Sequence, residues 1–171
     1  NMLVGQEGLD NDDTGDLKSG GGGGGTFVAT GSDYTSASPL IVGGGGGPAN
    51  DASGDQHNGR DALTASYGGD GDDTQGGENG NGGEGTTYSA GGAGFYTDGN
   101  GGYSSTQRGE AFQNGGLGGT ETDSQGVDSG FGGGSSGFDE SGAGGGYSGG
   151  GAGDTSGKEL GSGGGSWIDI S

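Results

Sequence analysis

Three aspartates, Asp70, Asp72 and Asp73, are the residues whose type and spacing best suit a chemical role. They lie in residues 68–73, whose sequence GGDGDD matches the start of a calcium-binding nonapeptide repeat. Carboxylate oxygens are the ligands that calcium prefers. The match ends at Gln75, where the repeat carries an apolar residue, and no second copy follows. The three aspartates are therefore candidate calcium ligands, and the alternative is an ordinary turn rich in aspartate and glycine.

The other patterns that suggest chemistry are incomplete. Residues 10–15 imitate the start of an EF-hand loop, but Gly21 stands where a bidentate glutamate belongs. His57 is the only histidine, and its neighbours, residues 55–60, have the composition of a loop. Nucleophilic catalysis would need that histidine beside a nucleophile and a third group to orient it. Phosphate-binding loops end in Gly-Lys-Ser/Thr, which is missing here. We therefore expect no enzymatic activity and, calcium aside, no cofactor.

Composition argues against a conventional core and against anionic partners. Of 171 residues, 56 are glycine and only 22% are hydrophobic, which is too little for an ordinary globular interior. The net charge of -20 should repel nucleic acid and anionic membranes. No apolar run is long enough to cross a membrane, so we expect no membrane insertion. The chain has no cysteine, which excludes disulfides and thiolate metal sites.

Glycine also limits the secondary structure. The longest stretch without glycine, residues 32–42, contains Pro39 and is shorter than the roughly 12 to 15 residues that an isolated helix needs. Essentially no α-helix is expected. Four short apolar segments bounded by glycine predict strands: residues 2–4, 26–30, 40–42 and 167–170.

The glycine runs at residues 20–25 and 43–47 flank two of these predicted strands. If residues 26–30 and 40–42 pair as a hairpin, the two runs emerge side by side and antiparallel. A glycine run prefers an extended left-handed helix of about three residues per turn, which makes no internal hydrogen bonds. Neighbouring runs can satisfy one another, because glycine lets backbones approach closely. The predicted fold is mainly β and irregular, a bundle of polyglycine-II helices joined to short antiparallel strands that form part of a β-sandwich. The same composition also fits a disordered chain.

We expect residues 1–171 to form a single glycine-rich domain of a longer protein. Residues 48–85 are polar and acidic and predict a long excursion, the most mobile part of the chain. Several aromatic residues follow glycine, and they are Phe95, Tyr103, Phe131, Phe138 and Tyr147. We expect them to pack on the flanks of the bundle, the alternative being that exposed ones stack on sugars or on a neighbouring subunit.

The order of apolar and glycine-rich segments along the chain resembles that of a known family. The segments are Leu3 to Gly8, Gly20 to Val28, Pro39 to Gly47, Gly130 to Gly134, Gly144 to Gly150 and Gly163 to Ile168. The series resembles the glycine-rich extracellular domain of the anaplastic lymphoma kinase and leukocyte tyrosine kinase receptors, similar domains also occurring in microbial and phage surface proteins. The resemblance implies a tumour-necrosis-factor-like β-sandwich with an inserted polyglycine bundle, which helps to bind a small basic cytokine. The lack of cysteine suits a microbial or viral protein better than an animal receptor.

These observations predict a non-enzymatic extracellular structural or adhesive module at a cell or virion surface. It would be a subunit or segment of a fibre, appendage or cell-surface assembly, with itself or neighbouring subunits as partners. The alternative is the ligand-binding ectodomain module of a receptor that captures a basic protein. Ice binding is a third hypothesis, which would favour regular rows of threonine or alanine, and thermal hysteresis would test it.

Overall fold

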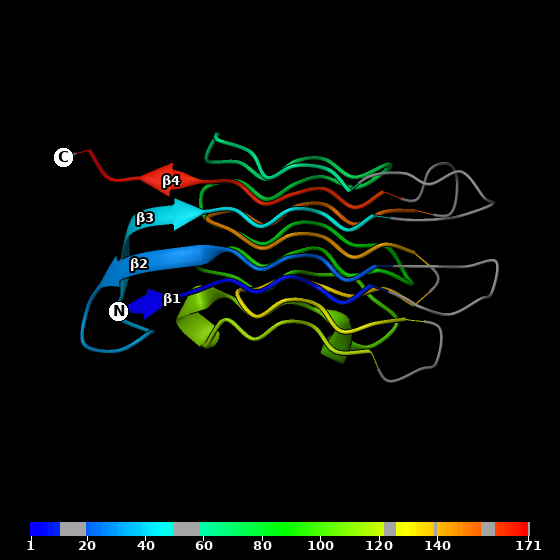
Figure 1. Ribbon diagram of the computed structural model, residues 1–171, viewed down its shortest axis with the longest axis horizontal. Helices are drawn as coiled ribbons and strands as arrows, with labels where there is room; N and C mark the ends of the chain where they lie inside the picture. Colours follow the sequence, from blue (N-terminus) through cyan, green and yellow to red (C-terminus); the bar gives the residue numbers. More distant parts are fainter. Residues whose placement is uncertain (11–19, 50–58, 122–125, 139, 155–159, 171) are drawn as a thin grey trace.

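The computed structural model describes residues 1–10, 20–49, 59–121, 126–138, 140–154 and 160–170. In these ranges, four short strands form one antiparallel sheet at one end of the molecule, and glycine-rich segments extend from it along the long axis (Figure 1). The helices described are two single 3-10 turns, η2 (Ser105–Gln107) and η3 (Phe112–Asn114). The predicted class, mainly β and irregular without α-helix, is confirmed for this part of the chain. None of its helices has the length and apolarity to cross a membrane.

The sheet forms from the four segments that the sequence predicts as strands. The strands are β1 (Met2–Leu3), β2 (Thr26–Thr30), β3 (Ser38–Gly43) and β4 (Trp167–Ile168), and they lie in that order. β2 is rich in β-branched and aromatic residues, which favour a pleated, half-buried surface. Its side chains alternate, so that Phe27 and Ala29 are buried while Thr26 and Thr30 are exposed. The sheet therefore has an inner face toward the rest of the molecule and an outer face.

Two local features shape the hairpin of β2 and β3. The register shifts between Val28 and Ala29, opposite Pro39, which has no amide to donate to a ladder. In the connecting turn, an Asp33 carboxylate oxygen accepts hydrogen bonds from the Ser36 amide at 2.8 Å and from the Thr35 hydroxyl at 2.9 Å. These bonds, that of the Ser36 amide first, lower the pKa of Asp33 to about 2.

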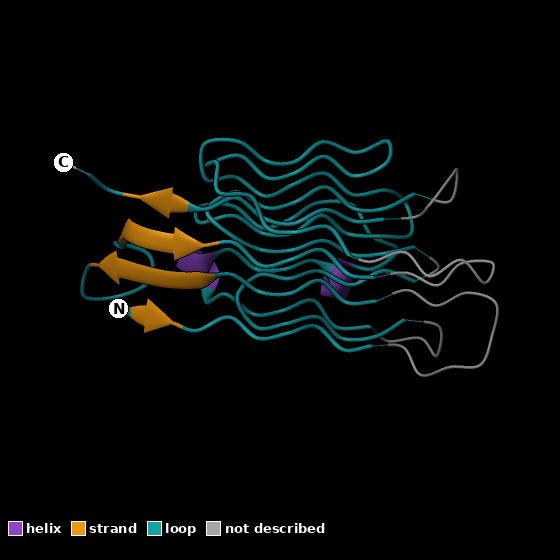
Figure 2. Ribbon diagram, turned by 45° about the horizontal axis from the view of Figure 1, so that its top comes forward, coloured by secondary structure: helices purple, strands orange, loops and turns teal. Residues whose placement is uncertain are grey.

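Beyond the sheet, the glycine-rich segments run side by side (Figure 2). Along residues 20–25, successive backbone amides donate hydrogen bonds to three different neighbouring segments in turn. The amides of Gly21, Gly22 and Gly23 donate to the carbonyl oxygens of Leu9, Ser135 and Gly46, at 3.2, 3.0 and 2.9 Å. Gly24 and Gly25 then return to the first two neighbours, at Gln6 and Gly132. The direction of donation therefore repeats every third residue. The bond from Gly23 to Gly46 also confirms that the two glycine runs lie side by side.

The most enclosed segment of the molecule, residues 141–153, is itself mostly glycine. Its amides donate to four other segments: Gly145 bonds to Gly23, Gly146 to Ala93, Tyr147 to Gly165 and Gly149 to Asn81. A Cβ added to Gly149 would lie 1.8 Å from the carbonyl oxygen of Gly92. Only a residue without a side chain fits such a spacing. Hydrogen bonds between backbones thus take the place of a side-chain core here.

A small apolar core lies where the sheet meets the glycine segments. Its central rings are Phe27, Phe95 and Phe112, with centroids 5.0 Å apart for Phe27 and Phe112 and 4.8 Å for Phe95 and Phe112. Tyr147 is also buried in this core. The expectation that aromatic residues pack is therefore confirmed for Phe95 and Tyr147. Tyr103 is 70% exposed, but its ring stacks on that of Phe138 at the surface, with centroids 5.7 Å apart.

The glycine-rich segments that bond to one another through their backbones form an array, and the described part of the polar stretch 48–85 belongs to it. The amides of Gly69, Gly77 and Gly83 donate to Gly163, Gly149 and Gly92, at 3.0, 2.8 and 2.8 Å. Residues 59–85 therefore share backbone hydrogen bonds with segments far along the chain.

Candidate functional site

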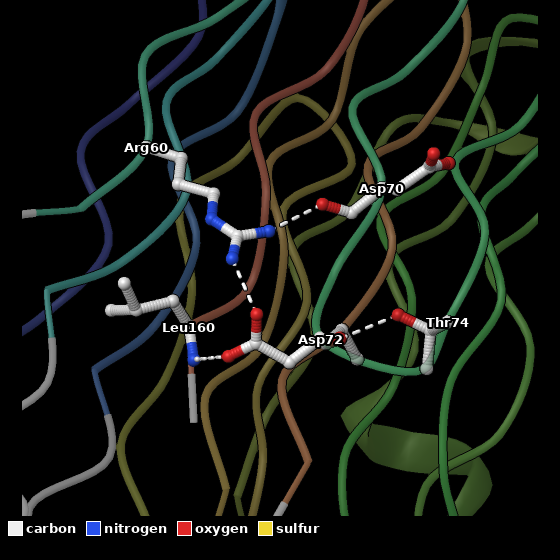
Figure 3. A network of polar contacts seen from close by, with 6 residues as sticks. Arg60, Asp70, Asp72, Thr74 and Leu160 are labelled. Atoms are coloured by element: carbon white, nitrogen blue, oxygen red, sulfur yellow. Dashed lines mark hydrogen bonds and ion pairs between the residues drawn. The ribbon is translucent and has the colours of Figure 1, made fainter. Parts of the chain in front are cut away.

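The candidate calcium ligands lie in a polar network with Arg60 (Figure 3). One guanidinium nitrogen of Arg60 donates to the backbone carbonyl of Asp70, and another forms an ion pair with the Asp72 carboxylate at 2.5 Å. The second Asp72 oxygen accepts a hydrogen bond from the Leu160 amide at 3.3 Å. Beside them, the Thr74 hydroxyl donates to the carbonyl of Ala152. The network ties three segments of the array together.

The carboxylates of Asp70 and Asp72 point in different directions. The Asp70 carboxylate points away from Arg60 (Figure 3) and accepts a hydrogen bond from the Gly76 amide at 3.0 Å. Asp72 faces the guanidinium, which supplies positive charge where a cation would otherwise be needed. Asp73 takes part in a separate polar interaction and is therefore not free. Over the ranges that the structure describes, no group of three or more carboxylate or histidine side chains is arranged to hold a metal ion.

Two of the patterns named from the sequence fall outside the described residues. His57 lies in residues 50–58, and most of the EF-hand-like stretch lies in residues 11–19. The geometry of neither is described here.

A second feature of functional interest is the outer face of the sheet. The register aligns one apolar residue from each strand in a single row across it: Met2, Val28, Ile41 and Ile168. We call this row the outer apolar row. Met2 is 73% exposed, Ile41 53% and Ile168 60%. The inner row of the same register, formed by Leu3, Phe27, Val42 and Trp167, packs in the apolar core. The sheet is thus apolar on both faces, as in sheets that are covered on both sides.

Two polar pairings of the structure could not be predicted from the sequence. Glu140 is almost fully buried and accepts a hydrogen bond from the Thr86 hydroxyl. Arg60 precedes Asp72 by twelve residues, and no local pattern links the two. Both pairings depend on how distant glycine segments lie together, which a single stretch of sequence does not indicate.

Comparison with known proteins adds no relative. No protein-family model matches the chain. A search of curated proteins finds no significant match either.

Proposed function

We propose that this protein is a non-enzymatic extracellular module with a structural or adhesive role, a subunit or segment of a fibre, appendage or cell-surface assembly. The observation that carries the proposal is the threefold alternation of hydrogen bonds along Gly21 to Gly25. Backbone bonds in three directions hold each segment against its neighbours. A body built in this way resists bending and leaves few exposed backbone groups for a protease to bind.

We interpret the bonded segments as polyglycine-II helices. A helix with about three residues per turn directs successive amides to three sides, which is the period of the observed hydrogen bonds. Among the described glycines, the positive φ values lie outside the runs 20–25 and 43–47. This distribution is compatible with the negative φ of the polyglycine-II conformation.

The outer apolar row supports an assembly role. Four aligned apolar side chains on an exposed sheet face form a surface that gains free energy when a neighbour covers it. The row carries no charge in a protein of net charge -20, so the repulsion between acidic chains is not concentrated there. A neighbouring sheet packed about 10 Å away would complete a sandwich.

Sedimentation velocity over a range of protein concentrations tests this role, with negative-stain imaging of the same samples. We expect the wild-type protein to associate as its concentration rises and the variant Ile41→Lys to remain monomeric. Thr120→Lys makes the same charge change at an exposed residue away from the sheet and should behave like the wild type. A wild type that stays monomeric at every concentration, or an Ile41→Lys variant that associates equally well, would count against the proposal.

The strong negative charge supports a second candidate function, the capture of a basic protein by a receptor ectodomain. The two functions respond to salt in opposite directions. Capture of a basic ligand weakens as salt screens the attraction, whereas association of like-charged chains strengthens as salt screens their repulsion. Sedimentation at low and high salt, alone and with small basic proteins, separates them.

A further inference from the structure

A hollow of about 330 Å³ lies beside β4, at the edge of the sheet. Its lining residues are Thr64, Ser66, Ser166, Trp167 and Ile168. The segment of residues 63–66 runs parallel to the segment that enters β4, because the Leu63 amide donates to Gly164 and the Ser166 amide donates to Ala65. The hollow is therefore built from two segments that the backbone fixes relative to each other.

The floor of the hollow is held firmly. The ring of Trp167 stacks on Tyr147, with centroids 4.7 Å apart and an angle of 18° between the planes. Tyr147 itself is buried in the apolar core. One face of the indole is thereby covered, and the part of Trp167 that stays exposed lines the hollow. A ligand would meet an aromatic surface that does not need to be ordered first.

Several polar groups around the hollow have unused hydrogen-bonding capacity. In the described part of the chain, the hydroxyls of Thr64 and Ser66 make no hydrogen bond. The hydroxyl of Ser166 accepts from the Gly44 amide at 3.1 Å, and its own proton is still available. The buried indole N–H of Trp167 has no acceptor among the described residues. Thr64 and Ser66 are exposed, so a ligand in the hollow can reach their hydroxyls. The indole N–H is buried and lacks the partner that buried polar groups usually have.

The backbone of β4 adds a further donor. Amides alternate in direction along a strand: Ser166 donates outward to Ala65, and Asp169 donates inward to Leu40. By the same alternation, the amide of Ile168 faces the outer edge of the sheet.

The hollow combines an aromatic surface with hydroxyls and an amide, and no charged side chain lines it. From this combination we propose that it binds a single neutral sugar ring. The C–H face of a pyranose would lie against Trp167 and its hydroxyls would bond to Thr64 and Ser66. The net charge of -20 disfavours sugars that carry a carboxylate. The proposal rests on the adhesive role proposed above, to which it gives a ligand class.

The test uses the intrinsic fluorescence of Trp167, which reports on this hollow alone because the chain has one tryptophan. The protein is titrated with the methyl glycosides of glucose, galactose, mannose and N-acetylglucosamine, and with glucuronate and N-acetylneuraminate. We expect a saturable change in emission at millimolar concentrations of at least one neutral glycoside, and none with the two acids. No saturable change with any neutral glycoside, or equal binding of the acids, would overturn the proposal.

The double variant Thr64→Val, Ser66→Ala tests whether the hydroxyls take part. Loss of two hydrogen bonds of ordinary strength should weaken binding about tenfold or more. Thr120→Val removes an exposed hydroxyl elsewhere and should leave binding unchanged. Unchanged tryptophan emission and circular dichroism of the free double variant show that it has folded. A folded double variant that binds as tightly as the wild type would exclude this site.

Sedimentation of the same samples separates this inference from the assembly role. Association without a response of Trp167 to sugars would overturn the inference alone. A saturable response in a protein that stays monomeric would support the sugar site and contradict the self-assembly.

Discussion

Gly22 and Ala143 lie so close together that a Cβ added to Gly22 would be 1.9 Å from the carbonyl oxygen of Ala143. The contact joins the first glycine run to the enclosed segment 141–153. Because the obstacle is backbone on both sides, neither segment can move aside without breaking its other hydrogen bonds. The substitution Gly22→Ala should therefore destabilise the protein by about 3 kcal/mol, as overpacking does in rigid interiors. Urea denaturation followed by circular dichroism measures the change.

Gly43→Ala provides the matched control. A Cβ at Gly43 meets nothing within 4 Å, and the residue lies in β3 without a positive φ. Alanine there should leave the free energy of unfolding unchanged or raise it by up to about 1 kcal/mol, because it restricts the unfolded chain. Equal losses for Gly22→Ala and Gly43→Ala would show that close backbone contact is not what the glycines provide.

The two faces of the sheet should respond differently to truncation. Phe27→Ala removes a buried ring that contacts Phe95 and Phe112, and should cost about 3 to 5 kcal/mol. Ile41→Ala removes a side chain that is half exposed on the outer face, and in dilute protein should cost less than about 1 kcal/mol. Thermal unfolding at low protein concentration compares the two. A large loss for Ile41→Ala under these conditions would mean that the outer face is already covered.

The turn between β2 and β3 should lose stability in acid. The pKa of Asp33 in the folded protein is about 2, below its ordinary value of 3.8, so the unfolded chain binds the proton more readily. The contribution of this carboxylate is therefore complete above about pH 5 and is lost as the pH falls through 2 toward 1. Melting curves of the wild type and Asp33→Asn should differ by a constant amount above pH 5, approach each other as the pH falls to 2, and converge below it. Curves that stay parallel down to pH 2 would contradict the prediction.

Asp72 can serve either as the partner of Arg60 in an ion pair or as a calcium ligand, and the two roles predict different results. If the ion pair stabilises the network, Arg60→Gln should lower the free energy of unfolding by about 1 kcal/mol, a modest value because both side chains are roughly one-third exposed. Millimolar calcium should then raise the melting temperature of the wild type no more than magnesium does. A selective increase with calcium, together with a neutral Arg60→Gln, would instead support the aspartates as calcium ligands.

The sequence predicts the sheet well and the rest of the array poorly, for physical reasons. The strands β2 and β3 consist of apolar residues between glycine runs, and their pairing is local, so the contact of Gly23 with Gly46 follows directly. The contact of Gly22 with Ser135 does not, because glycine runs carry no side chains that distinguish one partner from another. The same holds for the candidate site. The sequence identifies Asp72 as a candidate ligand, but it does not predict that Arg60 pairs with it.

Long separations along the chain between hydrogen-bonded neighbours have a consequence for the rate of folding. The amide of Gly22 bonds to residue 135, and that of Gly45 bonds to residue 145. Loops of this length must close before the bonds that fix them can form, and chains dominated by such contacts fold slowly. Unfolding must in turn break many mutually supporting hydrogen bonds together, which gives it a high activation barrier. We expect a native state whose lifetime is set by the height of that barrier more than by its equilibrium stability.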